Sequence, residues 1–284
     1  MIVWLASYPK SGNTLLRSML AAYFFSEDGI YDFPLIQNIR QFPNIRLFEN
    51  LGVDIRNEKE VIKNYIKVQE SFNKQNSVQF LKTHSYLFNI DNNAFTDLKN
   101  SLGSIYIVRD PRNVVTSWSK FANVSIQKAA DTLINTTQFG GDLNVKEGSE
   151  RSMVHMGTWN GNFQSWKSFK YQDRYLLIKY EELINNREEN FLKVLKFIFK
   201  LQKTKFDLNK SKFENVIETT DFAKLKKLEK EKGFSEAKTN KKTGEKIPFF
   251  NLGPKNDWKT MLDSEVRAKI EKAFEKEMLE LGYL

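Results

Sequence analysis

The sequence contains no cysteine and only two histidines among its 284 residues. The lack of cysteine excludes disulfides, thiolate metal sites and a cysteine nucleophile. It is compatible with a reducing compartment, so we expect a cytoplasmic protein. Two histidines cannot form an all-histidine metal site, and we expect no metal cofactor.

Long apolar stretches are also missing. No run approaches the ~20 apolar residues of a membrane span, and no leader of basic and then apolar residues precedes a cleavage site, so we expect no membrane span. The composition, 40% hydrophobic and 13% aromatic, is typical of a globular core. A chain of this length fits one large domain, and the prediction is a single domain over residues 1–284.

Acidic residues are outnumbered by basic ones, which gives a formal net charge of +9. Much of the excess lies between Lys224 and Lys246, where nine lysines face four glutamates. A lysine-rich segment of this kind is either a solvated surface or a patch that attracts a polyanion, such as a small multiphosphate ligand or a nucleic acid.

Short apolar runs of strand length alternate with stretches of helical periodicity. Strands are predicted over Ile2–Ala6, Val78–His84, Ser104–Arg109 and Tyr175–Leu183. Helices are predicted after Gly12, near Glu58–Lys74, from Pro111 behind an Asp110 N-cap, near Met153–Lys170 and around Glu188–Lys200. The alternation favours an α/β fold in which helices cover both faces of a central parallel sheet.

Charged and polar side chains follow the predicted strands. Lys10 follows the first strand, Lys82 and His84 end the second, Arg109 ends the third and Tyr180 lies at the end of the fourth. Ligands of parallel sheets bind beyond the carboxyl ends of the strands. These five side chains therefore predict a ligand site at one edge of the sheet.

The stretch SYPKSGNT lies between the first strand and the first helix. A tight loop at this place points backbone N–H groups and the positive end of the helix dipole at one position, which suits a phosphate. It is not the nucleotide loop G-x-x-x-x-G-K-[ST], because Asn13 follows Gly12 where that loop has lysine. Lys10 lies inside the loop instead. We therefore predict a P-loop-like phosphate site with a different chemistry.

Four motifs resemble those of the sulfotransferases that use 3′-phosphoadenosine 5′-phosphosulfate (PAPS) and release adenosine 3′,5′-bisphosphate (PAP). They are SYPKSGNT, FLKTH, VRDPRNVVTSWSKF and GPKNDWK. They occur in the family's order and extend from Ser7 to Lys259, nearly the whole chain. The resemblance implies a PAPS-dependent sulfotransferase whose phosphosulfate loop follows the first strand.

The resemblance also assigns the two phosphate positions. It implies that the 5′-phosphosulfate is held by Lys10, Ser11, Gly12, Asn13 and Thr14. It implies that Arg109 and Ser117 bind the 3′-phosphate, for which a guanidinium and a hydroxyl are suitable partners.

His84 is the predicted general base. The acceptor hydroxyl must lose its proton as it attacks sulfur, and an imidazole suits that task. The resemblance implies that Lys10 stabilises the charge on the leaving oxygen, and Lys82 is a plausible stabiliser of the sulfuryl oxygens. His155 matches no catalytic motif and serves as an internal control.

The segment TTDF resembles the family's adenine segment, which implies that the adenine lies against Thr220 and Phe222 with Tyr180 nearby, and the resemblance also implies that the backbone of Gly253 lies at the 3′-phosphate. The family's arginine and lysine of the 3′-phosphate clamp are replaced by Asn251 and Leu252. Our hypothesis is that Lys255, Lys246 or another lysine of the basic segment takes their place.

The acceptor is expected to be a hydroxyl compound of the small-molecule, lipid or carbohydrate type, and no nucleic-acid partner is expected. Three aromatic residues of the stretch Tyr31–Phe48 either line its pocket or anchor a lid, namely Phe33, Phe42 and Phe48. The sequence predicts no oligomeric state. Two alternatives remain: a small-molecule kinase or nucleotide hydrolase on a related fold, and a non-catalytic binder of nucleic acid or another polyanion.

Overall fold

A parallel sheet of five strands forms the centre of the computed structural model, which describes residues 1–73, 77–135, 154–239 and 244–284. The strand order is β2-β3-β1-β6-β7, and every pairing in it is parallel. The strands are β1 (Ile2–Ser7), β2 (Arg40–Gln41), β3 (Gln79–Thr83), β6 (Ser101–Val108) and β7 (Tyr175–Lys179). The predicted α/β fold with a central parallel sheet is confirmed.

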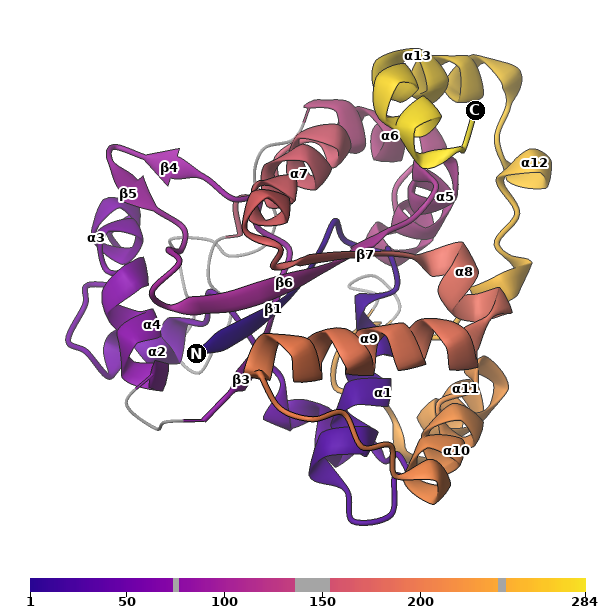
Figure 1. Ribbon diagram of the computed structural model, residues 1–284. Coiled ribbons are helices and arrows are strands. Elements are labelled where there is room, and N and C mark those ends of the chain that lie inside the picture. Colours follow the sequence, from indigo (N-terminus) through magenta and orange to yellow (C-terminus); the bar gives the residue numbers. More distant parts are fainter. Residues whose placement is uncertain (74–76, 136–153, 240–243) are drawn as a thin grey trace.

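Helices cover both faces of the sheet (Figure 1). Alternate residues of β1 belong to different hydrophobic cores: Trp4 belongs to the core that includes residues of α4, α5, α6, α7 and α13, and Leu5 belongs to the core that includes residues of α1, α9, α10 and α11. All six residues of β1 are buried, as expected for a strand covered on both sides. The helices are α1 (Asn13–Phe25), α4 (Tyr65–Asn73), α5 (Pro111–Ala122), α6 (Ile126–Asn135), α7 (Trp159–Trp166), α9 (Arg187–Gln202), α10 (Lys210–Thr219), α11 (Phe222–Lys232) and α13 (Ser264–Leu281).

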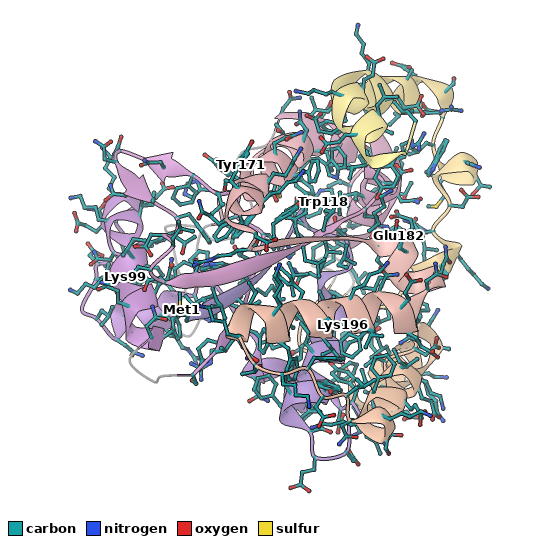
Figure 2. All side chains as sticks on the ribbon, in the orientation of Figure 1. Met1, Lys99, Trp118, Tyr171, Glu182 and Lys196 are labelled. Atoms are coloured by element: carbon teal, nitrogen blue, oxygen red, sulfur yellow. The ribbon has the colours of Figure 1, made fainter. Side chains whose placement is uncertain are left out.

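Shorter elements connect these layers. The helical ones are η1 (Phe33–Asn38), α2 (Ile45–Glu49), α3 (Glu58–Lys63), η2 (Lys167–Gln172), α8 (Tyr180–Asn185), η3 (Gly253–Lys255) and α12 (Trp258–Met261). Two small hairpins are formed by β4 (Asn89–Ile90) with β5 (Asn93–Ala94) and by β8 (Lys238–Thr239) with β9 (Lys246–Ile247). Side chains fill the space between the sheet and the helices (Figure 2). Trp118 is one of the buried side chains, and Tyr171 on the surface is 88% exposed.

Three predicted elements differ most from the structure in their bounds. The strand predicted to reach Leu183 ends at Lys179, and α8 begins at Tyr180 with two glutamates in its first turn, where they suit the helix dipole. The helix predicted near Glu58–Lys74 is divided at Asn64, which caps α3.

The helix predicted near Met153–Lys170 begins only at Trp159, because Thr158 accepts a hydrogen bond from the Gly161 N–H and caps it. The ends of these two predictions at Lys74 and Met153 lie outside the described residues, as do residues 240–243 of the basic segment. Within the described ranges, no helix is both long and apolar enough to cross a membrane.

Candidate active site

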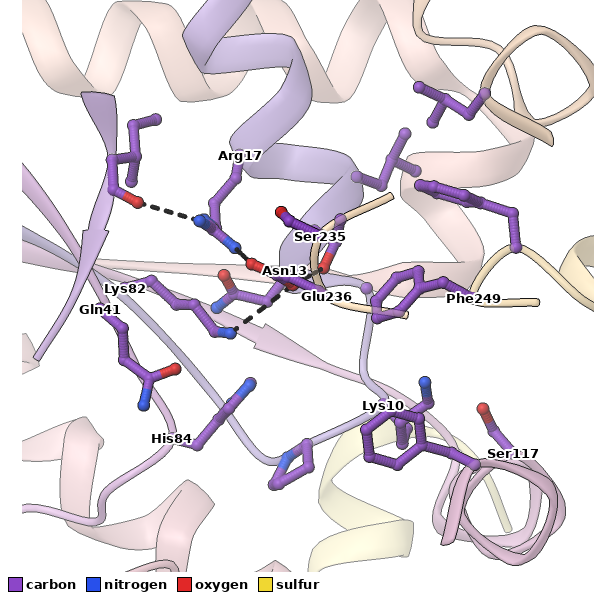
Figure 3. A pocket seen from close by; sticks show the side chains of 18 of the residues that line it. Lys10, Asn13, Arg17, Gln41, Lys82, His84, Ser117, Ser235, Glu236 and Phe249 are labelled. Carbon is purple, nitrogen blue, oxygen red and sulfur yellow. Dashed lines mark hydrogen bonds and ion pairs between the residues drawn. The ribbon is translucent and has the colours of Figure 1, made fainter. Parts of the chain in front are cut away.

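A cavity of about 920 Å³ opens at the carboxyl ends of the strands (Figure 3). It brings together most of the site residues predicted from the sequence. Those that line it are Lys10, Gly12, Asn13, Thr14, Lys82, His84, Arg109, Ser117, Tyr180, Phe222 and Gly253. Two predicted residues, Ser11 and Thr220, are fully buried beside the cavity and do not line it.

The turn between β1 and α1 has two residues of positive φ, Lys10 at 66° and Gly12 at 98°. A Cβ atom on Gly12 would lie 2.3 Å from Cδ2 of Tyr180, so only glycine lets this ring pack on the turn. The Asn13 amide donates to the Leu5 carbonyl (2.9 Å) and to Ser7 Oγ (3.1 Å). The first turn of α1 is thereby fixed to the end of β1, with its N–H groups facing the cavity edge.

Arg109 is 6% exposed and has no carboxylate partner among the residues that the structure describes. Its Nη1 donates to the Lys10 carbonyl (3.0 Å), and its Cζ lies 4.3 Å from the ring centroid of Tyr180. Its Nε is buried without a hydrogen-bond partner in the described chain. A guanidinium in a cavity wall with an unpartnered N–H and no facing carboxylate is well suited to bind an anion.

His84 follows β3, and its Nδ1 lies 2.8 Å from the carbonyl oxygen of Ser7. A carbonyl only accepts, so Nδ1 carries the proton and Nε2 keeps its lone pair. Burial lowers the pKa of His84 to about 3, and the charge of Lys82 acts in the same direction. The imidazole is therefore neutral near physiological pH. Figure 3 shows the His84 ring beside Lys82, with Lys10 farther along the cavity.

A carboxylate that was not predicted, Glu236, reaches the same end of the cavity (Figure 3). Its Oε1 lies 2.6 Å from Arg17 Nη1, and its Oε2 lies 4.0 Å from Lys82 Nζ and 3.5 Å from Thr14 Oγ1. Burial alone would raise the pKa of Glu236, but the charges of Lys82 and Arg17 hold it well below its usual range. Burial lowers the pKa of Lys82 to about 8, against the opposing effect of Glu236.

Lys10 lies between two phenyl rings. Its Nζ is 4.1 Å from the ring centroid of Phe121 and 4.6 Å from that of Phe249. Cation–π contacts of this type hold an ammonium group in place without neutralising it. Lys10 therefore brings a positive charge to the edge of the cavity.

The adenine side of the predicted site is apolar. A Cβ atom on Gly253 would lie 2.3 Å from Cζ of Phe222, so the ring rests directly on the glycine backbone. Ile184, Leu225 and Leu252 complete this part of the lining. The Thr220 hydroxyl donates to the Val216 carbonyl (2.7 Å) and accepts from Arg187 (2.9 Å), which leaves it a structural role beside the cavity.

The cations proposed to replace the missing clamp can now be placed. Asn251 and Leu252 line the cavity, as the motif predicts, but Lys255 and Lys246 do not. Lys120 lines it instead, three residues after Ser117 on the same face of α5. This lysine was not predicted, although its spacing from Ser117 is visible in the sequence.

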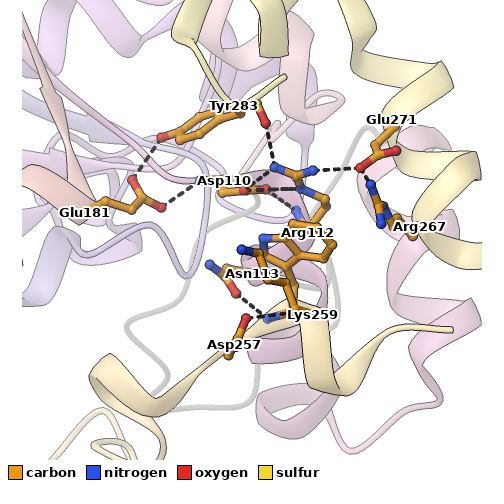
Figure 4. A network of polar contacts seen from close by, with 10 residues as sticks. Asp110, Arg112, Asn113, Glu181, Asp257, Lys259, Arg267, Glu271 and Tyr283 are labelled. Atoms are coloured by element: carbon orange, nitrogen blue, oxygen red, sulfur yellow. Dashed lines mark hydrogen bonds and ion pairs between the residues drawn. The ribbon is translucent and has the colours of Figure 1, made fainter. Parts of the chain in front are cut away.

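A polar network behind the cavity fixes the start of α5 (Figure 4). Arg112 pairs with Asp110 (2.7 Å) and with Glu271 of α13 (2.6 Å), and it also donates to the Tyr283 carbonyl (2.7 Å). The Tyr283 hydroxyl donates to Glu181 (2.9 Å), which accepts in turn from the Asp110 N–H (3.0 Å). The residues that directly follow Arg109 and Tyr180 are thus held by the C-terminal segment.

Two asparagines support the site in ways that the sequence did not reveal. Asn256 accepts from the Thr116 hydroxyl (2.7 Å) and donates to the Asn113 carbonyl (2.8 Å), which joins the C-terminal motif to α5. Asn162 of α7 donates to the backbone carbonyl of His84 (2.9 Å). These contacts join residues that are far apart in the sequence, so no local sequence pattern predicts them.

The second histidine, His155, pairs with a carboxylate outside the cavity. His155 Nε2 lies 2.9 Å from Glu58 Oε1, and His155 does not line the cavity. It therefore remains a suitable control for His84.

The stretch 31–48 contributes to the cavity, but not through its aromatic side chains. Phe33, Phe42 and Phe48 are buried in the core, where Phe42 packs on Trp4 with a centroid distance of 5.6 Å. Polar neighbours face the cavity instead, including Arg40 and Gln41. Within the described ranges, no group of three or more His, Cys, Asp or Glu residues is arranged to hold a metal ion.

Comparison with known proteins identifies similar chains. The sulfotransferase domain model matches residues 2–282. Flavonol 3-sulfotransferase from Flaveria bidentis is 25% identical over 280 residues, which cover 97% of this chain and 81% of that protein.

Two solved structures share the fold. Retinol dehydratase in a complex with retinol and PAP aligns over 98% of this chain and 81% of its own, with a TM-score of 0.60 and 14% identity. A mouse sulfotransferase complexed with PAP aligns over 97% of this chain and 84% of its own, with a TM-score of 0.56 and 16% identity.

Proposed function

This chain belongs to the sulfotransferase domain family and is a PAPS-dependent transferase, and on that basis we propose which residues hold the nucleotide and move the proton. The nucleotide lies along the carboxyl-end edge of the sheet, and the sulfuryl group passes to an acceptor hydroxyl beside His84. The family match favours this function over a kinase, a nucleotide hydrolase or a non-catalytic polyanion binder.

The buried Arg109 carries the proposal. Its guanidinium lies in the cavity wall with Nε unpartnered and no carboxylate beside it in the described chain. A dianionic phosphate would satisfy both its charge and its free N–H. Arg109 and Ser117 are therefore assigned to the 3′-phosphate, and Lys120 supplies a second cation there.

The 5′-phosphosulfate is assigned to the turn that precedes α1. The helix α1 has 13 residues, and its dipole favours an anion at its N-terminal end. The backbone N–H groups at this end are those of Ser11, Gly12, Asn13 and Thr14. The Lys10 ammonium is close enough to this turn to stabilise charge on the leaving phosphate oxygen. PAPS supplies an activated sulfuryl group when it is bound, and the chain supplies the charges around it.

The adenine is assigned to the apolar part of the cavity. The rings of Tyr180 and Phe222 and the backbone of Gly253 line a slot suited to a flat base. Leu15 also lines the cavity. Thr220 holds Arg187 and the end of α10 behind this slot rather than meeting the base directly.

His84 is assigned as the general base. The acceptor oxygen forms a bond to sulfur while the bond from sulfur to the phosphate oxygen breaks, and the acceptor proton passes to His84 Nε2. The Ser7 carbonyl fixes the required tautomer, and the neutral state of the ring leaves Nε2 ready to accept. Lys82 is assigned to the sulfuryl oxygens because its ammonium lies at the same end of the cavity.

Two measurements test this proposal. PAP at ~100 times its Kd should raise the free energy of unfolding by roughly 2.7 kcal/mol, read as a shift in melting temperature. His84→Ala should lower kcat by roughly 10²–10⁴ without changing that shift, since the base does not hold the nucleotide. His155→Ala is the control and should leave kcat nearly unchanged. Equal losses of kcat in both variants would reject His84 as the base.

A further inference from the structure

The cavity extends past His84 to a part that the nucleotide assignment does not use. Figure 3 shows Gln41 and His84 at the end of the cavity opposite to Ser117. Gln41 is the partner of Lys82 in the register of β2 on β3, and His84 follows Lys82 by two positions. We refer to the cavity lining formed by residues 37–50 as the acceptor wall. A molecule that presents a hydroxyl to His84 Nε2 meets this wall at Gln41.

Aromatic rings line the cavity only on its nucleotide side. Within the described chain, the aromatic residues of the lining are Phe121, Tyr180, Phe222, Phe249 and Phe250. Two of these rings flank the Lys10 ammonium, one packs on the Arg109 guanidinium and one rests on Gly253. The fifth, Phe250, has its ring centroid 6.3 Å from that of Phe222. Sites for flat apolar ligands are lined mainly by apolar and aromatic groups, so the acceptor wall does not suit a flat aromatic acceptor.

Amide side chains take the place of rings on the acceptor wall. Those at the cavity are Gln37, Gln41, Asn44 and Asn50. The Gln41 side chain makes no hydrogen bond to any part of the chain that the structure describes. Its amide has two N–H donors and a carbonyl acceptor. The Gln41 amide can therefore bind a hydroxyl group both as donor and as acceptor.

The acceptor wall is fixed in place before an acceptor binds. Ile39, Phe42 and Phe48 are fully buried, and Arg17 donates from inside to the Ile39 carbonyl (3.0 Å). The Phe42 N–H donates to the Lys82 carbonyl (2.8 Å), which holds the wall against β3. Because its anchors are in the core, the wall presents its amides at defined positions.

The Glu236 carboxylate faces the same end of the cavity (Figure 3). Its Oε1 pairs with Arg17 at 2.6 Å, whereas its Oε2 lies 3.5 Å from Thr14 Oγ1 and 4.0 Å from Lys82 Nζ. Thr14 is assigned to the phosphosulfate, and once its hydroxyl binds that group, Oε2 keeps only the distant ammonium. A carboxylate oxygen only accepts hydrogen bonds. Oε2 is therefore placed to accept one from an O–H group of the acceptor.

From these observations we propose that the acceptor is a ring polyol of the sugar type, in which the reacting hydroxyl has hydroxyl neighbours on the adjacent carbons. His84 Nε2 takes the proton of the reacting hydroxyl, and the neighbouring hydroxyls bind to the Gln41 amide and to Glu236 Oε2. Gln41 and Glu236 thus determine the specificity for the acceptor. The inference rests on the proposed sulfuryl transfer and specifies its second substrate.

Matched ring alcohols test the inference with labelled PAPS. The probes are cyclohexanol, the cis and trans isomers of 1,2-cyclohexanediol, methyl β-glucoside, and 2-naphthol as a flat aromatic acceptor. We expect kcat/KM per hydroxyl for at least one of the polyhydroxyl probes to exceed that for cyclohexanol tenfold or more, equivalent to about 1.4 kcal/mol. The reason is that a site built to bind a substrate hydroxyl rejects the analogue that lacks it. Equal or higher kcat/KM for cyclohexanol or for 2-naphthol would overturn the inference.

Two variants test the residues of this site. Gln41→Leu should remove most of the preference for polyhydroxyl probes and leave the PAP-induced shift in melting temperature unchanged. Gln127→Leu is the matched control, because Gln127 is exposed and lies off the cavity. Glu236→Gln should also lower the preference, and effects on Lys82 or on PAPS cancel because the preference is a ratio between two acceptors. An unchanged preference in either variant would contradict the inference.

Saturation-transfer NMR on the PAP complex gives a second readout that needs no turnover. The polyhydroxyl probes should bind more tightly than cyclohexanol. Equal binding of cyclohexanol and the diols, or no binding of any polyhydroxyl probe, would also overturn the inference. Failure of PAP to stabilise the protein would instead reject the proposed function.

Discussion

At the level of single residues, we expect the pair of Lys82 and Glu236 to set the upper pH limit of activity. Lys82, with a pKa of about 8, is charged below that pH and loses its proton above it. His84 stays neutral through the same range because its pKa is about 3. We therefore expect kcat/KM for PAPS to fall as the pH rises through about 8, and to show no enzyme group titrating near the usual histidine value. A pH–rate profile checks both features.

The variant Glu236→Gln provides the control for that profile. Glu236 raises the pKa of Lys82 against burial, so its neutralisation should move the alkaline fall to lower pH. The titration of PAPS itself is common to both enzymes and cancels in the comparison. An alkaline fall at the same pH in both proteins would show that Lys82 is not the titrating group.

Lys120 offers another test at the residue scale. Lys120→Gln should raise KM for PAPS about fivefold, which corresponds to roughly 1 kcal/mol for an exposed ion pair. Lys255→Gln should have little effect, since Lys255 is exposed away from the cavity. Titration of initial rates with PAPS measures both. A larger rise in KM for Lys255→Gln than for Lys120→Gln would show that Lys255, and not Lys120, replaces the missing cations at the 3′-phosphate.

At the level of elements, the turn between β1 and α1 depends on Gly12. In Gly12→Ala, the added Cβ would lie 2.3 Å from the Tyr180 ring at a φ of 98°, so we expect the ring or the turn to move and the Kd for PAP to rise at least about tenfold. Isothermal titration with PAP measures this. Gly52→Ala is a matched control, because Gly52 has a φ of 70° and no atom within 4 Å of the added Cβ. Similar losses in both variants would point to general backbone strain.

Elements that depend on local pattern could be predicted from the sequence, and elements that depend on distant contacts could not. The strand ends that carry Lys10, His84 and Arg109 follow from short apolar runs and from motifs next to them. The contact of Glu236 with Arg17 joins residues 219 positions apart, and neither belongs to a motif. The strand predicted to reach Leu183 stopped at Lys179 because the two glutamates after it favour the first turn of a helix.

At the level of the whole molecule, the network around Arg112 joins the nucleotide edge to the C-terminus. Its guanidinium and the Asp110 carboxylate are both nearly buried, with 6% and 7% of the side chain exposed. Arg112→Met should lower the free energy of unfolding by about 3–5 kcal/mol, because it leaves a buried carboxylate without its partner. Thermal or urea unfolding measures the loss. Arg267→Met removes an exposed partner of Glu271 and should cost far less.

The order of the strands in the sheet could not be predicted from the sequence. Alternating strands and helices predict a parallel sheet, but the edge strand β2 has only two residues and no apolar run. It forms because the Phe42 N–H donates to the Lys82 carbonyl (2.8 Å) and because the neighbouring rings are buried. The acceptor side of the cavity therefore depends on packing, whereas the nucleotide side depends on motifs.

The alternation of buried anchors and cavity-facing polar groups in residues 37–50 has an evolutionary consequence. Mutations at Gln37, Arg40 or Asn50 alter no residue of the core, so they meet little selection against unfolding. Since we propose that the acceptor binds beside His84, at this part of the cavity, we expect such mutations to change the acceptor while the donor site stays the same.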